Sequence, residues 1–252
     1  MILDPHSIAT REKLILAGLF LSKFDKAGLA MLGFEGFNEA FNLIGFALGG
    51  KPASIKNYRD EFDPLFPNPR AGRHQRSTRG YCARVLKEYD SLDIQTFCAL
   101  IKSFVGYDEK ASTEAPKAGD ENESAFARRL ITGLAAEHYF ESVQSSLSEF
   151  SNYVLENTTR LGCGYDFRLQ SKTDDPFLAV EVKGLMDKAG GLSFTPKEHY
   201  VAETLTDRFY LFVVKNFREA PFHEIYQNPL AGPLRFEKKK RVVVQISWLA
   251  SV

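Results

Sequence analysis

Apolar residues recur at a helical spacing through the first hundred positions of the chain. Residues 37–48 follow the 3.6-residue period of an amphipathic helix, and Gly49-Gly50 ends it. Ser54 stands at the expected N-cap of the helix that comes next. Similar patterns predict further helices over 7–24, 54–63, 81–89 and 94–104. The first part of the chain is therefore predicted to be all-helical.

The pattern changes in the second half, where strand-like runs follow one long helical segment. Some of these runs alternate and others are almost entirely apolar, as in strands that are covered on both faces. The predicted elements are a helix over 123–150, strands over 164–170 and 177–185, a helix over 197–205, and strands over 208–216 and 241–249. This order predicts a mixed α/β domain.

Between the two halves lies a polar, charged stretch, residues 107–122, that contains Pro116 and Gly119 and almost no large apolar side chains. Such a composition is typical of a linker. We therefore expect a helical domain over 1–106, a linker over 107–122 and an α/β domain over 123–252.

Composition limits the class of protein without identifying a partner. The 252 residues are 44% hydrophobic, and 32 acidic residues balance 32 basic ones. Net charge therefore indicates no partner, and a nucleic-acid surface would have to come from local clustering. The three cysteines show no zinc spacing, and no leader or membrane span of about 20 apolar residues is visible. We expect a soluble, cytoplasmic protein with no membrane partner.

The predicted strand FLAVEVKGL, residues 177–185, carries two charges in its interior, Glu181 and Lys183. Residues two apart point to the same face of a strand, so both charges leave it side by side. A third charge, Asp166, precedes on the neighbouring strand, and antiparallel pairing would bring it next to Glu181. Two adjacent carboxylates suit Mg²⁺, and a lysine beside them could orient or deprotonate a bound water.

An Asp on one strand followed by Glu-x-Lys on the next resembles the PD-(D/E)xK nuclease motif. Four sequence segments, taken in order, resemble the NO VEIN C-terminal domain family. They are GYDF, AVEVKG, GGLSFTPKEHYVAE and FYLFVVKN. The resemblance covers about residues 123–230. It implies a restriction-endonuclease-like fold with a central mixed sheet flanked by helices. It also implies that Asp166, Glu181 and Lys183 are catalytic. The two acids would hold Mg²⁺, which Mn²⁺ could replace.

Three further residues join this candidate site through the same resemblance. Glu137 is similar in position to a metal-associated glutamate on the helix before the first strand of such nucleases. Glu198 matches the acid at the start of the following helix, and Lys197 beside it could touch phosphate. Two alternatives stay open: Glu137 as a solvated helix residue, and Glu181 with Lys183 as an ion pair on an exposed face.

The predicted elements around Gly49-Gly50 have a helix-turn-helix-like layout. In such a layout the second helix would enter the major groove of DNA. Its candidate DNA contacts are Ser54, Lys56, Asn57 and Arg59. A basic segment follows, with candidate phosphate or minor-groove contacts at Arg70, Arg73, Arg76 and Arg79. The alternative is a plain helical bundle followed by a solvated loop.

These residues together predict a Mg²⁺-dependent DNA endonuclease, a type II restriction enzyme or a related prokaryotic defence nuclease. Double-stranded DNA is the expected substrate. Cutting both strands with one site per chain predicts a homodimer. Three alternatives remain: a DNA-recognition module that does not cut, a nuclease for RNA or damaged DNA, and a regulator whose second domain serves as an oligomerisation scaffold.

Overall fold

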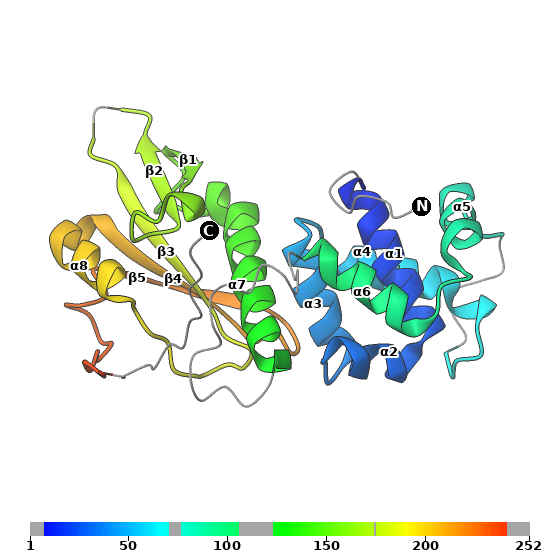
Figure 1. The fold of residues 1–252 in the computed structure, drawn as a ribbon. Coiled ribbons are helices and arrows are strands. Elements are labelled where there is room, and N and C mark those ends of the chain that lie inside the picture. Colours follow the sequence, from blue (N-terminus) through cyan, green and yellow to red (C-terminus); the bar gives the residue numbers. More distant parts are fainter. Residues whose placement is uncertain (1–7, 71–76, 106–122, 174, 241–252) are drawn as a thin grey trace, which may run out of the picture.

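The computed structural model describes residues 8–70, 77–105, 123–173 and 175–240, and for 123–127 only the backbone course. Up to residue 105 these segments form helices, and after residue 122 they form helices and one sheet. The two halves lie side by side, with the long helix α7 next to α3 (Figure 1). A mixed α+β architecture is thereby confirmed.

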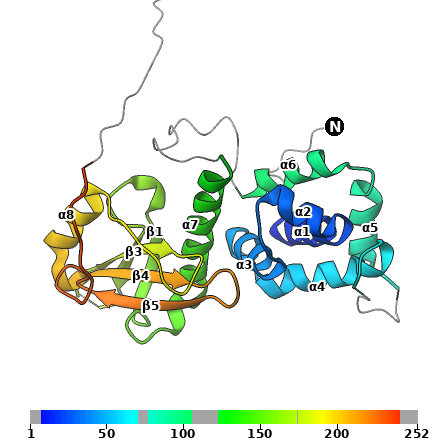
Figure 2. The ribbon, with the colours of Figure 1, turned by 90° about the horizontal axis from the view of Figure 1, so that it is seen from below.

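The helical half is built around α1, which is buried from Leu14 to Ser22. Figure 2 shows α1 in the middle, with the other helices around it. Gly18 allows α4 to lie directly on α1, because a Cβ at this position would come within 2.5 Å of Tyr58 Cβ. The helices are α1 (Thr10–Lys23), α2 (Asp25–Leu32), α3 (Phe37–Ala47), α4 (Pro52–Phe62), α5 (Gly80–Tyr89) and α6 (Ile94–Phe104).

Two boundaries in this half differ from the sequence-based prediction. The helix expected to begin after Ser54 begins at Pro52 instead, and its N-cap residue is Lys51. Proline has no N–H and a φ suited to the first helical turn, so it starts this helix three residues earlier. The separate helix α2 was not predicted. It begins at Asp25, whose φ of 45° breaks the chain direction directly after α1.

The second half contains one five-stranded sheet, in the order β1-β2-β3-β4-β5. Neighbouring strands are antiparallel except β3 and β4, which run parallel and are joined through α8. The long helix ends at Val143 rather than at residue 150. The elements are α7 (Glu123–Val143), β1 (Tyr153–Asn157), β2 (Phe167–Ser171), β3 (Leu178–Gly184), α8 (Pro196–Leu205), β4 (Phe209–Lys215) and β5 (Phe222–Gln227).

The two faces of the sheet are covered by different helices. Val180 and Val182 of β3 belong to the apolar core that includes Phe140 of α7. Ala179 of the same strand packs instead with Ala202 of α8. Because side chains alternate along a strand, Glu181 and Lys183 lie on the α8 side with Ala179. The polar residues of β3 therefore share a face, as predicted.

The two halves meet through α3, α7 and the turn between β4 and β5. Asn42 Nδ2 of α3 donates to the carbonyl oxygen of Phe217 over 2.8 Å. The rings of Phe46 and Tyr139 lie 5.1 Å apart, centroid to centroid. The helical half is thus fixed to the strand β4 that pairs with the charged strand β3.

Several sequence-based expectations fall on residues that the structure does not describe. They are the linker over 107–122 and the strand over 241–249. None of the helices that the structure does describe has the length and apolar character needed to cross a membrane.

Candidate active site

The charged residues of β3 form a direct ion pair. Lys183 Nζ lies 2.5 Å from Glu181 Oε1. Glu181 is only 3% exposed, so its carboxyl group is removed from water. A pair on an exposed face, the alternative raised by the sequence, is therefore excluded for Glu181.

Asp166 joins this pair from the start of β2. Phe167 pairs with Val180, so Asp166 continues the ladder opposite Glu181. Its Oδ2 accepts a hydrogen bond from the backbone N–H of Val182 over 2.8 Å. The predicted antiparallel neighbourhood of the two acids is confirmed.

The Gly-Tyr-Asp sequence before β2 has a structural reason for its glycine. Gly164 has a φ of +92°, and a Cβ there would come within 2.9 Å of Val201 Cγ2 on α8. Only glycine allows the chain to pass this closely under α8 in that conformation. This turn delivers Asp166 to the edge of β3.

The first turn of α8 reaches the same lysine. Thr195 and Glu198 form a capping box: Glu198 N–H donates to Thr195 Oγ1 over 3.2 Å, and Glu198 Oε2 accepts from Thr195 N–H over 3.0 Å. That same Oε2 accepts from Lys183 Nζ over 2.9 Å. Glu198 therefore ties the beginning of α8 to the charged strand, and Lys183 sits between two carboxylates.

Glu137 approaches from α7. This helix packs tightly on the end of β3, where a Cβ on Gly184 would come within 2.7 Å of the Thr132 carbonyl oxygen. Burial, Asp166 and Glu141 raise the pKa of Glu137 to about 7, and Lys183 lowers it in part. Glu137 is thus close enough to Asp166 and Lys183 to sense their charges, although no hydrogen bond links it to them.

The site holds more negative than positive charge. Burial and Asp166 raise the pKa of Glu181 to about 9, although Lys183 lowers it in part. Burial also raises the pKa of Asp166, against the stabilising N–H of Val182. For Lys183, burial lowers the pKa, but Glu181 and Glu198 outweigh it and leave it raised. The site thus contains more acidic than basic side chains, since Lys183 faces several acids.

This arrangement fits a small divalent cation. Asp166 and Glu181 offer oxygen donors at adjacent positions, and Mg²⁺ is commonly held by one or two carboxylates together with water. Their raised pKa values mark carboxyl groups that a cation would stabilise in the ionised form. Within the described part of the chain, no group of three or more His, Cys, Asp or Glu side chains forms a ready-made metal cage.

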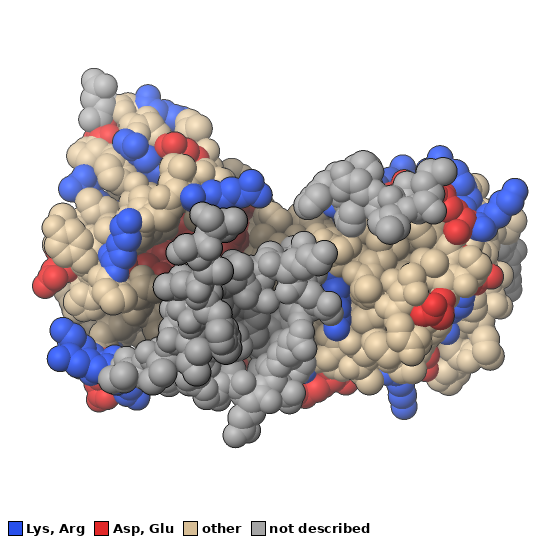
Figure 3. Space-filling model, in the orientation of Figure 1, with Lys and Arg blue, Asp and Glu red and all other residues tan. Residues whose placement is uncertain are grey.

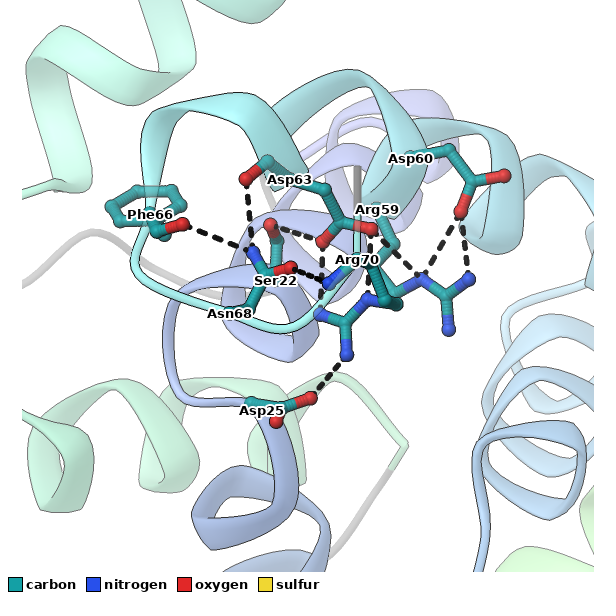
Figure 4. A network of polar contacts seen from close by, with 8 residues as sticks. All are labelled: Ser22, Asp25, Arg59, Asp60, Asp63, Phe66, Asn68 and Arg70. Atoms are coloured by element: carbon teal, nitrogen blue, oxygen red, sulfur yellow. Dashed lines mark hydrogen bonds and ion pairs between the residues drawn. The ribbon is translucent and has the colours of Figure 1, made fainter. Parts of the chain in front are cut away.

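Two predicted DNA contacts prove to be internal (Figure 4). Arg59 is buried, lies over the rings of Phe37 and Phe41, and pairs with Asp60 over 2.7 Å. Its prediction as a base-reading residue is therefore wrong, because its side chain does not reach the surface. The reason is its place on α4, four residues after Ile55, on the face that packs into the bundle.

Arg70 is the centre of the same network rather than a free phosphate contact. Its Nε and Nη2 donate to the buried carboxylate of Asp63 over 2.8 and 2.9 Å, and its Nη1 donates to Asp25. Ser22 Oγ also donates to Asp63 over 2.7 Å. The guanidinium thus holds three helical segments together, and the prediction of a phosphate contact at Arg70 is corrected accordingly.

The remaining predicted contacts are distributed over the surface. Lys56 and Asn57 on α4 and Lys197 on α8 are exposed, and Ser54 is half-buried. Arg79 is partly exposed and pairs with Glu61 over 3.5 Å. Arg73 and Arg76 lie outside the described residues. On the face seen in Figure 3, basic and acidic side chains are interspersed over both halves.

Comparison with known proteins agrees with the geometry of the second half. No curated protein and no solved structure matches the chain. One family model matches, described as Protein NO VEIN, C-terminal, over residues 134–227. This range includes α7 from Leu134 onward and the whole sheet, and with them every acid of the site and Lys183. The resemblance predicted from the sequence is confirmed: residues 134–227 are similar to the NO VEIN C-terminal domain family.

Proposed function

We propose that the chain is a metal-dependent endonuclease that hydrolyses phosphodiester bonds in double-stranded DNA. The observation that carries the proposal is the position of Lys183, held by Glu181 and Glu198 within the same site as Asp166. A buried ion pair alone would need one acid. A site that gathers further acids around one lysine suits a reaction centre better than a structural contact.

Each residue has a role in this proposal. Asp166 and Glu181 would hold Mg²⁺ or Mn²⁺. When bound, the ion would polarise a phosphate oxygen and acidify a bound water. Lys183 orients or deprotonates the attacking water, or its ammonium group stabilises the negative charge that grows on phosphorus. Glu198 is a positioning residue, since it fixes Lys183 Nζ and ties it to the first turn of α8.

The biological role that we propose is restriction or a related prokaryotic defence reaction. One site per chain cuts one strand, so cleavage of a duplex calls for two chains, and a symmetric pair of chains would match a symmetric DNA site. Lys56 and Asn57, both exposed on α4, remain candidates for contacts made by the helical half, together with Ser54 and the partly exposed Arg79.

The test is cleavage of unmethylated phage DNA with Mg²⁺ or with EDTA. Wild type is compared with Lys183→Ala and with a control, Lys188→Ala, whose side chain is 71% exposed in the loop after β3. We expect discrete fragments from wild type and the control, and none from Lys183→Ala or with EDTA. Fragments that persist in Lys183→Ala would refute the assigned centre.

Two other results would redirect the proposal. If the wild type binds DNA in a gel-shift assay but never cuts it, the domain is a recognition module. If it cuts single-stranded RNA or damaged duplexes in a substrate panel but does not cut intact DNA, the assigned active site is retained. The substrate is then RNA or damaged DNA.

A further inference from the structure

Two arginines gather over one phenyl ring on the sheet. Arg168 Cζ lies 4.3 Å from the ring centroid of Phe177, and Arg208 Cζ lies 5.8 Å from it. Arg168 belongs to β2, Phe177 directly precedes β3, and Arg208 directly precedes β4. Three separate segments thus bring two like charges to one place. The ring face attracts each cation, but their mutual repulsion is unrelieved unless an anion lies nearby.

Neither arginine forms an ion pair with an acid among the residues that the structure describes. Glu156 stands opposite Arg168 across the β1–β2 ladder without forming an ion pair with it. The Nε of Arg168 is buried and has no acceptor within those described segments. A buried, unpaired guanidinium N–H is costly, because it loses water and gains no partner. Arg59 and Arg70 of the helical half, in contrast, are both satisfied by aspartates.

The cluster lies on the same face as the candidate active site. Arg168 pairs with Ala179 across β2 and β3, and Ala179 pairs with Phe209 of β4. Ala179 and Glu181 are two residues apart, which corresponds to roughly 7 Å along the strand. Along the axis of a duplex one strand carries a phosphate about every 3.4 Å, so this length spans about two phosphates measured along that axis. An extended nucleic-acid strand on this face would therefore meet both places.

We propose that Arg168 and Arg208, supported by Phe177, form a phosphate-binding subsite for the strand that is cut at the Asp166–Glu181 centre. The subsite rests on the proposed nuclease function and extends it. It assigns the electrostatic contact with DNA to the α/β domain itself. Arginine suits this task, because its planar group can stack on a ring and still donate to phosphate oxygens from its edge.

The test is equilibrium binding of a short fluorescent DNA duplex, measured by anisotropy in EDTA so that no strand is cut. Arg168→Gln and Arg208→Gln are compared with wild type and with Arg84→Gln. Arg84 is a matched control, since its side chain is 71% exposed and its Nη2 lies 3.9 Å from the carboxylate of Glu12. We expect each subsite variant to bind roughly tenfold more weakly, as for loss of one charge-assisted contact.

Salt dependence supplies the specific signature. Each subsite variant should lower the slope of log affinity against log salt by about one, and Arg84→Gln should leave it unchanged. Thermal unfolding of each variant shows whether the fold is intact. Should Arg168→Gln fail to fold, Arg208→Gln carries the salt test, and Arg168→Lys, which keeps the charge, should retain the wild-type slope. Wild-type affinity and slope in Arg208→Gln, and in Arg168→Gln where it folds, would overturn the subsite.

The result separates this proposal from the nuclease proposal. Arginine-dependent binding without any Mg²⁺-dependent cleavage would refute the nuclease and keep the subsite. Cleavage by wild type with an unchanged KM in Arg168→Lys and Arg208→Gln would keep the nuclease and overturn the subsite. The same dependence of binding on Arg168 and Arg208 with an RNA duplex would support the phosphate-binding subsite and would extend its ligand from DNA to RNA. Absence of any nucleic-acid binding by wild type would overturn both.

Discussion

Replacing Lys183 by methionine is the change that most directly tests the charge balance of the site. Methionine keeps much of the length of the side chain and removes its charge. Glu181 then loses the cation at 2.5 Å and Glu198 the cation at 2.9 Å, while both acids stay within the fold. We expect the metal-free protein to lose stability.

The size of this loss follows from burial. The Glu181 side chain is 4% exposed, that of Glu198 15% and that of Lys183 23%, so water can compensate only weakly. Removing one partner of a buried ion pair costs about 3–5 kcal/mol. Because Lys183 is not fully buried, we expect about 3 kcal/mol at pH 10, where Glu181 is ionised. For a chain of this size that corresponds to a fall in Tm of roughly 6–12 °C.

The loss should grow with pH. The pKa of Glu181 rises from its ordinary value of 4.5 to about 9 in the folded protein. Between these values the unfolded chain releases this proton and the folded protein keeps it, so the free energy of unfolding falls as pH rises, by up to about 1.4 kcal/mol per pH unit. Without Lys183 the folded pKa moves higher still. The difference between wild type and variant should therefore be small at pH 7, where Glu181 is protonated in both folded proteins, and large at pH 10, above the wild-type pKa of about 9.

Urea unfolding followed by circular dichroism, at pH 7 and pH 10 in EDTA, measures this difference. Lys188→Met is the control, because its partner Glu219 is exposed and 3.7 Å away. It should change stability by less than about 1 kcal/mol at both pH values. Adding Mg²⁺ at pH 8 should then stabilise Lys183→Met more than wild type. Equal losses at the two pH values, or no loss, would refute the charge imbalance that we assign to the site.

Two further predictions separate function from stability. Glu198→Gln keeps an oxygen for the capping hydrogen bond but loses the charge that holds Lys183, so kcat should fall between about tenfold and a hundredfold. Thr195→Ala should instead lower stability by about 1 kcal/mol and retain cleavage, and similar cleavage rates in the two variants would contradict a positioning role for Glu198. In the helical half, Asp63→Asn should cost about 3 kcal/mol in urea unfolding, because Asp63 is buried and receives both Arg70 and Ser22. Asp90→Asn, in an ion pair whose acid is 54% exposed, should cost less than about 1 kcal/mol, and equal losses would contradict the network.

The central strands were predictable from the sequence, and the edges of the sheet were not. The strands β3 and β4 are almost fully buried, so their sequences are nearly continuous apolar runs. The edge strands β1 and β5 are partly exposed, and their mixed residues resemble those of a loop. A short half-exposed strand is defined by its pairing with a neighbour, which a local pattern does not contain.

The same limit explains which site residues were found. Glu181 and Lys183 were visible because two charges inside an apolar strand demand an explanation. The contact of Glu198 with Lys183 could have been anticipated from Thr195-x-x-Glu198, since a capping box fixes where its glutamate lies. Nothing local indicated Arg168 and Arg208, because they lie 40 positions apart in the chain and only the sheet register brings them together.

The burial and pairing of Arg59 and Arg70, which had been predicted as DNA contacts, change where a nucleic acid would be held. A basic run in the sequence predicted the contact near Arg70, but the acids that neutralise Arg70 come from other helical segments and are invisible to a local reading. Charge that is paired inside the bundle contributes little attraction at the surface, because each cation's field is cancelled nearby. Arg168 and Arg208, on the face of the candidate site, have no such ion-pair partner among the residues that the structure describes. In a chain of zero net charge, the arginines without acidic partners, rather than the most basic stretch, are the better guide to where phosphate would bind.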